Sequence, residues 1–161
     1  MPMSTYYREL RAKIGSDLIF SPSVAAIIRN QDQEILFVQS VTDLLWSIPA
    51  GAIELGETPA AAICREVFEE TGLTVRPFRI LGVVGGRNFR WTYPDGNRVE
   101  YLTVVFECQV EAGELSAIDG EVAAFRYFSP ADLPPLQFPY PHAWFDGTIK
   151  EAWFEDPESA P

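Results

Sequence analysis

The sequence predicts an α+β sandwich in which extended segments surround one central helix. Apolar segments of strand length recur along the chain, and a single helical pattern with clear start and stop signals lies among them. With 161 residues, of which 47% are hydrophobic, the chain suits one continuous core. We therefore expect one domain over 1–161, with an N-terminal extension at 1–17 and a Pro- and aromatic-rich C-terminal segment at 130–161.

The elements before the central helix follow from local patterns. Residues 4–15 predict a short helix. "SVAAIIRN" at 23–30 and "EILFVQS" at 34–40 are joined through "QDQ", and we expect them to form the two strands of a hairpin. "LLWSIPA" at 44–50 predicts a further extended piece.

The central helix has defined ends. Thr58 is a good N-cap, Pro59 suits the first helical position, and Gly72 suits the left-handed position after the last turn. The strands expected after the helix lie at 78–86, 98–110 and 122–129, and the first two are separated by 87–97 with its Pro-Asp-Gly-Asn turn signal.

Three carboxylates gather on this helix. At about 100° per residue, Glu66, Glu69 and Glu70 converge, and like charges at this spacing destabilise a helix by roughly 0.2–0.5 kcal/mol per pair unless something neutralises them. We expect the opposite side to face the core; its residues are Ala60, Ala61, Cys64, Val67, Phe68 and Thr71. The carboxylates should then point away from the core, either as a solvated acidic face or towards a neutralising partner.

The residues around the helix favour a metal as that partner. The Gly-punctuated loop "AGAIELGE" can bring backbone carbonyls and Glu57 close to the helix, and Arg65 stands where it can orient a carboxylate. Carboxylate and carbonyl oxygens are the ligands that Mg²⁺ and Mn²⁺ prefer.

The same residues resemble a known family motif. Gly51 is followed after five residues by Glu57, and after seven more by "REVFEETGL" at 65–73. This segment resembles the complete Nudix box, G-x5-E-x7-R-E-U-x-E-E-x-G-U with U apolar, and every fixed position is filled. The resemblance implies the Nudix fold, an α/β/α sandwich with a mixed central sheet. It also implies hydrolysis of a nucleoside diphosphate linked to another group, with Mg²⁺ or Mn²⁺ as cofactor.

The resemblance assigns roles to individual residues. It implies that Glu57, Glu66, Glu69, Glu70 and the backbone carbonyl of Ala50 bind metal, and that Arg65 orients a carboxylate. Arg65, Glu66 and Glu69 are then catalytic residues.

One carboxylate must accept the proton of the attacking water. Within the box this is Glu66, but some Nudix enzymes use an acid from a later loop. Here that loop is 114–122, which offers Glu114, Asp119 and, as the favoured candidate, Glu121. The alternative for each loop acid is a side chain that merely keeps the surface soluble.

The residues of the box do not indicate which substrate is bound. Arg87, Arg90 and Trp91 lie beside the turn and can stack a base and meet phosphate charge, and Trp46 can line the same pocket. The alternative is that aromatic cross-strand pairs stabilise a hairpin, that the arginines lie in water and that Trp46 is a core residue. His142, the only histidine, is expected to be structural or exposed.

Charge and composition exclude several classes. The net charge of −11 argues against non-specific binding to nucleic acid polymers or anionic membranes, so the expected partner is a small nucleotide-type pyrophosphate. Cys64 and Cys108 fit core positions rather than a zinc site, and no apolar run is long enough to span a bilayer. We expect a soluble cytoplasmic protein, and a homodimer is possible.

Two other functions compete with hydrolysis. Some Nudix relatives isomerise isoprenoid diphosphates, but the early strands hold no obvious catalytic cysteine. A non-catalytic nucleotide-sensing module is the rival from a different class, and the intact box favours catalysis over it.

Overall fold

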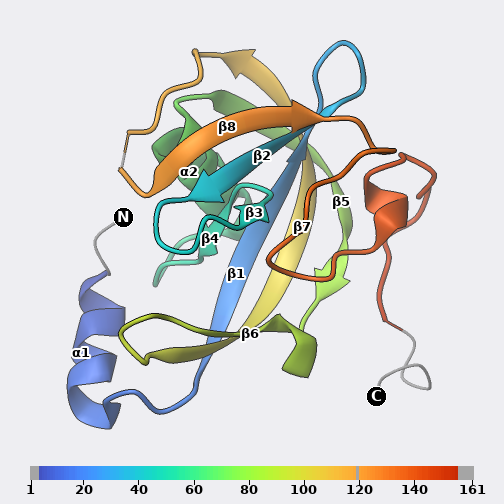
Figure 1. Ribbon diagram of the computed structural model, residues 1–161. Coiled ribbons are helices and arrows are strands. Elements are labelled where there is room, and N and C mark those ends of the chain that lie inside the picture. The colour runs from blue at the N-terminus through green and yellow to red at the C-terminus, as the bar shows by residue number, and fades with distance from the viewer. Residues whose placement is uncertain (1–3, 119, 156–161) are drawn as a thin grey trace.

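The computed structural model describes residues 4–118 and 120–155, whose strands form two sheets (Figure 1). The strands are β1 (Ile19–Ile28), β2 (Ile35–Ser40), β3 (Trp46–Ser47), β4 (Ala50–Ala52), β5 (Thr74–Val84), β6 (Arg90–Thr92), β7 (Arg98–Ala112) and β8 (Val122–Phe128). The helices are α1 (Thr5–Ile14), α2 (Pro59–Thr71) and the short 3₁₀ helices η1 (Arg87–Phe89) and η2 (His142–Trp144).

The larger sheet is mixed. Its order is β4-β1-β7-β5, with β6 added to β7. β1 and β7 run parallel over ten residue pairs, from Ile19 opposite Val99 to Ile28 opposite Cys108, whereas the other pairs are antiparallel. The predicted turn at 94–97 lies between β6 and β7, which pair antiparallel, and β5 also pairs with β7. The predicted α+β class with a mixed sheet is therefore confirmed.

The predicted hairpin between 23–30 and 34–40 is wrong. β1 belongs to the larger sheet, whereas β2 lies between β3 and β8 in the smaller one. The two segments pair only beside the connecting turn, at an isolated bridge between Arg29 and Ile35 and through a hydrogen bond from Asn30 N to Glu34 O of 3.0 Å. The physical reason is that β4 and β7 occupy both edges of β1, so β2 must find its hydrogen-bond partners elsewhere.

The central helix begins and ends as predicted. The side chain of Thr58 accepts a hydrogen bond from Ala61 N at 3.2 Å, and Pro59 occupies the first turn. Gly72 adopts φ 74°, and its N–H donates to Phe68 O at 2.8 Å. Local capping chemistry therefore positions the helix that carries the carboxylates.

The buried face of α2 differs from the prediction. Its buried residues are Ala62, Ile63, Glu66, Val67 and Thr71. Phe68, expected in the core, is 47% exposed, and Glu66, expected to point away from the core, is only 7% exposed. Positions 63, 66 and 67 share one face by the helical period, so the burial of Ile63 and Val67 carries Glu66 inward, against β4.

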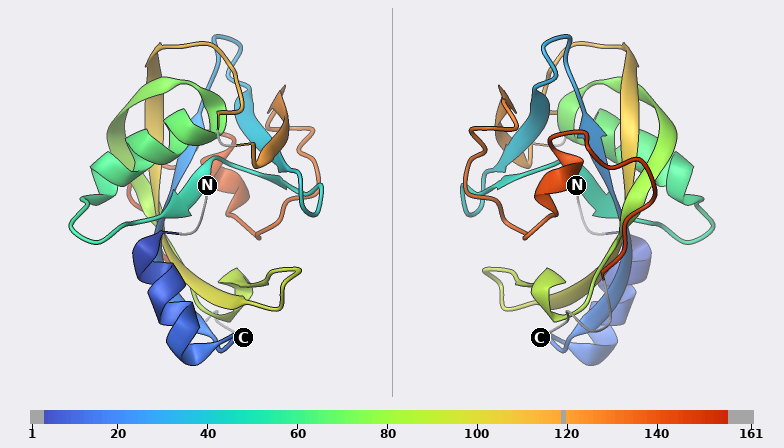
Figure 2. Two further views of the ribbon diagram at one scale, coloured as in Figure 1. Left: turned by 90° about the vertical axis from the view of Figure 1, so that its left-hand side faces the viewer. Right: turned by 90° about the vertical axis from the view of Figure 1, so that its right-hand side faces the viewer.

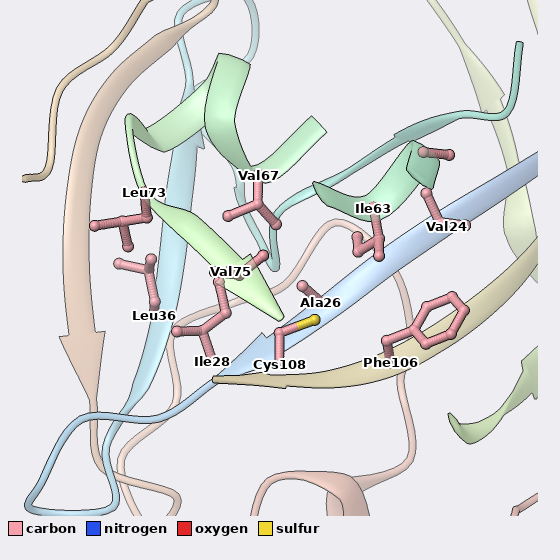
Figure 3. Packing of buried hydrophobic residues seen from close by; sticks show 11 residues of the cluster. Val24, Ala26, Ile28, Leu36, Ile63, Val67, Leu73, Val75, Phe106 and Cys108 are labelled. Carbon is pink, nitrogen blue, oxygen red and sulfur yellow. The ribbon is translucent and has the colours of Figure 1, made fainter. Parts of the chain in front are cut away.

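The larger sheet is covered on both faces. Val24, Ala26 and Ile28 of β1 pack beneath α2 against Ile63 and Val67 (Figure 3). The intervening β1 residues belong to a second cluster on the other face; its members include Ala25, Ile27, Phe37, Ile48, Trp144 and Phe145. Figure 2 shows α2 and η2 on opposite sides of the sheet. The layer opposite α2 thus contains the C-terminal segment with a 3₁₀ turn and not a long α-helix.

Both cysteines contact apolar surroundings, as expected. Cys108 is buried in the cluster beneath α2, and burial raises the pKa of its thiol to about 12. Cys64 is half-buried, and its Sγ donates to Val75 O at 3.3 Å.

α1 lies apart from both clusters, beside β6 at one end of the molecule (Figure 1). Ser4 caps it by accepting from Tyr7 N, and none of its residues is buried. Two contacts attach it to the larger sheet: the Tyr7 hydroxyl bonds to Ser21 Oγ at 2.6 Å, and Arg11 Nη2 donates to Arg98 O at 2.7 Å. Over residues 4–118 and 120–155, no helix is long and apolar enough to cross a membrane.

Candidate active site

A large cavity lies beside the second half of α2. Its volume is about 580 Å³, within the usual range for a small-molecule site. The backbone of 50–52 and the side chains of Glu66 and Glu70 form one wall. Most of the other lining residues come from α1, β1, β2 and the loop after it, β6, β7, the start of β8 and the C-terminal segment. The cavity therefore joins the predicted acidic cluster to parts of the chain that are distant in sequence.

Arg65 is the centre of the acidic cluster. Its Nη1 donates to Glu66 Oε1 at 2.7 Å and to Glu69 Oε2 at 3.0 Å. Its Nε and Nη2 bond to the two oxygens of Glu57 at 2.9 and 2.8 Å, and Nη2 also donates to Ala52 O at 2.9 Å. One guanidinium thus pairs with three carboxylates, offsets part of their charge and fixes the loop before α2.

This cluster shifts the pKa values of its members in opposite directions. Hydrogen bonding to Arg65 lowers the pKa of Glu57, and the carboxylates raise the pKa of Arg65 further above its usual range. Burial raises the pKa of Glu66 despite its bond to Arg65, and the charges of Glu69 and Glu57 add to the rise. Glu66 is therefore the carboxylate that the fold desolvates most.

Gly51 leaves the space that the Glu66 carboxylate fills. A Cβ at position 51 would stand 2.0 Å from Glu66 Cδ and 2.2 and 2.3 Å from its two oxygens. No larger residue fits there while Glu66 keeps this position. Glu70 is fixed on the same wall, because its Oε2 accepts a hydrogen bond from Ala50 N at 3.0 Å.

The donor set suits a hard divalent cation, but the described residues hold no preformed cage of three acidic, histidine or cysteine side chains. Glu66 and Glu70 line the cavity beside the carbonyl-bearing backbone of β4. Glu57 and Glu69 face Arg65 and do not line it. Mg²⁺ is typically bound by one or two carboxylates plus waters and substrate phosphates, so the residues fit such an ion.

The candidate loop acids have different positions. Glu121 lies on the cavity wall, and its backbone carbonyl accepts from Val41 N at 3.0 Å. Glu114 is exposed outside the lining, and Asp119 lies outside the described residues.

The predicted substrate-binding residues separate into two groups. Trp91 lines the cavity and packs edge-on against Phe138 at 5.9 Å between ring centroids. Arg87, Arg90 and Trp46 do not line it.

The three residues outside the lining have other surroundings. Arg90 pairs with Glu100 across the β6–β7 ladder, and Arg87 is exposed. Trp46 packs edge-on against Phe128 at 5.0 Å, on the second core cluster. His142 is exposed, as expected, with Nε2 3.1 Å from Pro130 O.

The cavity also contains residues that sequence reasoning did not identify. Tyr7 and Arg11 come from α1, Tyr101 from β7, and Phe138 and Tyr140 from the C-terminal segment. For Tyr101 a signal existed, since the period of two places it on the same side of β7 as Thr103 and Val105. Nothing in the local pattern of the C-terminal segment indicates which aromatic residue faces the cavity.

Comparison with known proteins agrees with the box and the fold. The NUDIX domain family matches residues 20–151. A MutT-like protein of Streptomyces ambofaciens is 29% identical over 115 residues, which are 71% of this chain and 68% of that protein. A putative ADP-ribose pyrophosphatase of Bacillus subtilis is 32% identical over 107 residues, which are 66% of this chain but only 49% of that protein.

A solved structure aligns over more of the chain. The ADP-ribose pyrophosphatase of Streptococcus suis superposes with a TM-score of 0.65 and 27% identity, over 83% of this chain and 96% of that one. The family match covers most of the chain, including the complete box at 51–73, and the superposition extends to the fold around it. The chain therefore belongs to the NUDIX domain family and is a Nudix hydrolase.

Proposed function

We propose that this Nudix hydrolase cleaves the pyrophosphate bond of a nucleoside diphosphate linked to another group, by attack of water assisted by Mg²⁺ or Mn²⁺. The observation that carries the proposal is the placement of Glu66 and Glu70 beside the backbone of β4 on the wall of one large cavity. The names of the similar Streptococcus protein, an ADP-ribose pyrophosphatase, and of the similar Bacillus protein, a putative ADP-ribose pyrophosphatase, support this substrate class.

The metal role falls to Glu66, Glu70 and the carbonyl of Ala50 in this proposal. A bound divalent cation supplies neutralisation of the phosphate oxygens and a lower pKa for the attacking water. Glu57 and Glu69, which the box also predicts as ligands, must first leave Arg65, because their oxygens face its guanidinium. Their binding of metal stays a prediction.

The residues of the site have separate roles in the proposed reaction. Arg65 holds Glu66 by Oε1 and so fixes the plane of that carboxylate. Glu66 accepts the proton of the attacking water, and Glu121 is the alternative base because it lies on the same cavity. The aromatic wall around Trp91 and Phe138 excludes water from one side of the substrate and offers a face for stacking.

A substrate panel tests the reaction. The protein is incubated with ADP-ribose, a nucleotide sugar, a dinucleoside polyphosphate, a nucleoside triphosphate and a 5′-capped RNA oligonucleotide, each with MgCl₂ and with MnCl₂, and products are identified by mass. We expect cleavage within the pyrophosphate of a small substrate. Cleavage of the RNA alone would contradict the expectation that no nucleic acid polymer is bound.

Variants of the acidic cluster test the residue roles. Glu70→Gln should lower kcat by at least about 100-fold, as expected when a preorganised charge is lost from the site, and should weaken Mn²⁺ binding without unfolding the protein. Glu111→Gln is the matched control, since Glu111 is an exposed β7 residue paired with Arg76. Full activity in Glu70→Gln would end the assignment of Glu70 as a ligand.

A further inference from the structure

Three pairs of hydroxyl groups in the described part of the chain line the cavity. Tyr7 Oη lies 2.6 Å from Ser21 Oγ, Ser23 Oγ lies 2.6 Å from Thr103 Oγ1, and Tyr93 Oη lies 2.5 Å from Tyr101 Oη. All six residues belong to the cavity lining.

Four of these residues form a regular polar patch on the larger sheet. Ser21 is opposite Tyr101, and Ser23 is opposite Thr103, in the parallel β1–β7 register. Because strand side chains alternate with a period of two, the four side chains share one face. Ser21, Ser23 and Thr103 are at most 5% exposed, in positions where burying a hydroxyl group costs free energy unless it is bonded. This part of the sheet therefore lines the cavity, and its hydroxyl-bearing residues are not members of the buried apolar clusters.

The hydroxyl pairs keep hydrogen-bonding capacity for a ligand. Within each pair one hydroxyl donates its proton, so the other still has a proton, and both retain lone pairs. The contacts of Ser21 and Ser23 with backbone carbonyls are 3.4 Å long, beyond the usual range for a hydroxyl donor, and compete weakly. These hydroxyl groups can both donate and accept hydrogen bonds. The hydroxyl groups of a sugar can do the same, so the two surfaces are complementary.

The charges around the cavity oppose a longer phosphate chain. Six of the described residues that line it are acidic: Asp43, Glu54, Glu66, Glu70, Asp95 and Glu121. Among the described lining residues, Arg11 is the single cation, and its guanidinium already donates to the carbonyls of Gly15, Asp17 and Arg98. A third phosphate would thus face carboxylates without an available guanidinium or ammonium group.

α1 completes this part of the cavity. It precedes the matched segment 20–151, yet it contributes Tyr7 to a hydroxyl pair. Figure 2 shows α1 and β6 at the same end of the molecule, apart from α2. Arg11 positions α1 there through its bond to Arg98 at the start of β7.

We propose that the three hydroxyl pairs form a subsite for a neutral polyhydroxylated group, a sugar joined to the second phosphate, and that Tyr7 of α1 is a specificity-determining residue of this subsite. The inference rests on the proposed function, since it names the group linked to the nucleoside diphosphate.

Binding of non-hydrolysable ligands tests the subsite without turnover. Three probes are titrated by calorimetry in MgCl₂: α,β-methylene ADP-ribose, the methyl ester of α,β-methylene ADP, and an ATP analogue with methylene groups at both the α,β and β,γ bridges. The first two carry the same charge and differ in the sugar. We expect the sugar ligand to bind at least about tenfold more tightly than either of the others, which corresponds to about 1.4 kcal/mol. Equal affinity for the sugar ligand and the methyl ester, or tighter binding of the ATP analogue, would overturn the proposal.

Matched variants then test Tyr7. Tyr7→Phe and Thr103→Val should each reduce the preference for the sugar ligand about fivefold and leave the affinity for the methyl ester unchanged. Tyr6→Phe removes the neighbouring hydroxyl, which lies outside the cavity, and should change neither affinity.

Ser21→Ala breaks the same hydrogen bond but leaves the Tyr7 hydroxyl in place. A smaller loss in this variant than in Tyr7→Phe supports direct contact between Tyr7 and the sugar. An equal loss of affinity for both ligands in Tyr7→Phe would reduce Tyr7 to an anchor of α1 and overturn its role. Failure of the proposed function would look different, as absence of ADP-ribose hydrolysis by a protein that still prefers the sugar ligand, and that result would support the subsite.

Discussion

At the scale of single residues, the site depends on how closely one carboxylate approaches the backbone. Glu66 lies where the side chain of any residue other than glycine at position 51 would stand. The atoms in conflict are the carboxylate end of a flexible side chain, and Gly51 does not adopt a positive φ. A larger residue at 51 would therefore displace Glu66 and leave the backbone in place.

Gly51→Ala should separate activity from stability. We expect activity to fall at least about 100-fold, as when a positioned catalytic group is lost, while the free energy of unfolding changes by less than about 1 kcal/mol. Kinetics and urea unfolding of the same preparation measure both quantities.

A double variant checks that the effect passes through Glu66. Adding Gly51→Ala to Glu66→Gln should cost little further activity, because both changes act on one carboxylate. Additive losses would show that Gly51 matters for another reason.

At the scale of the helix, Arg65 reduces the repulsion expected among the carboxylates of α2, because it pairs with Glu66 and Glu69. The sequence interpretation looked for a metal as the neutralising partner, whereas the structure shows that a residue of the helix itself pairs with Glu57, Glu66 and Glu69. The strain that this helix would have without metal is therefore smaller than the charge count suggests.

Arg65→Gln should destabilise the protein. It leaves three partly buried carboxylates without their cation, and loss of one partner of a buried ion pair costs about 3–5 kcal/mol, which we reduce to about 2–3 kcal/mol because the Arg65 side chain is 25% exposed. Urea unfolding at neutral pH measures the change. Arg76→Gln, in an exposed pair with Glu111, is the control and should cost less than about 1 kcal/mol.

Glu69→Gln and Glu70→Gln distinguish a residue that binds Arg65 from a residue that binds metal. A cation that binds only the folded protein stabilises it by about 2.7 kcal/mol at 100 times its Kd. Melting is followed in EDTA, MgCl₂, MnCl₂ and NaCl of matched ionic strength. We expect Glu70→Gln to lose the divalent shift, whereas Glu69→Gln should keep it only if Glu69 stays paired with Arg65 when metal binds. Loss in both would restore Glu69 as a ligand, and identical shifts of wild type in MgCl₂ and matched NaCl would remove the metal site.

At the scale of the whole molecule, the tyrosines around the cavity connect stability to pH. Burial raises the pKa of Tyr101 well above its usual range, and the neighbouring Tyr93, Tyr7 and Tyr140 add to the rise. In the unfolded chain tyrosine loses its proton near pH 10. Above that pH the folded protein binds more protons than the unfolded chain, so its stability must fall as the pH rises.

Tyr101→Phe should flatten this dependence. Each group that stays protonated only in the folded protein contributes a slope of about 1.4 kcal/mol per pH unit. Between pH 10 and 11 the variant should therefore lose less stability than wild type by up to this amount. Urea unfolding at pH 8, 10 and 11 measures it. Parallel curves for the two proteins would show that Tyr101 ionises normally in the folded state.

The whole molecule also shows what the sequence could predict. The ends of α2 follow from Thr58, Pro59 and Gly72 because capping depends on neighbouring residues alone. The division of β1 and β2 between two sheets could not be predicted from the sequence. Strand pairing depends on which strand edges are already occupied by segments that are distant in the sequence. The box residues were found by their spacing, but the direction of Glu66 depends on how α2 packs against β4.

The residues of the cavity wall opposite the box could not be predicted from the sequence either. Tyr7 and Phe138 lie 131 positions apart in the sequence and line one cavity, and neither belongs to a recognisable motif. The assembly of whole molecules stays a prediction as well. Light scattering measures whether the protein is a monomer or forms the homodimer that the sequence analysis allows.

The lack of buried residues in α1 has a consequence for how specificity can change. An element that is not packed into a core can accumulate substitutions, or be exchanged for another segment, without unfolding the protein. The cleavage machinery and the apolar clusters lie in the matched segment, whereas part of the recognition surface is carried by this separate helix. Substrate preference can therefore evolve, or be engineered, by replacing a single peripheral helix while the chemistry stays the same.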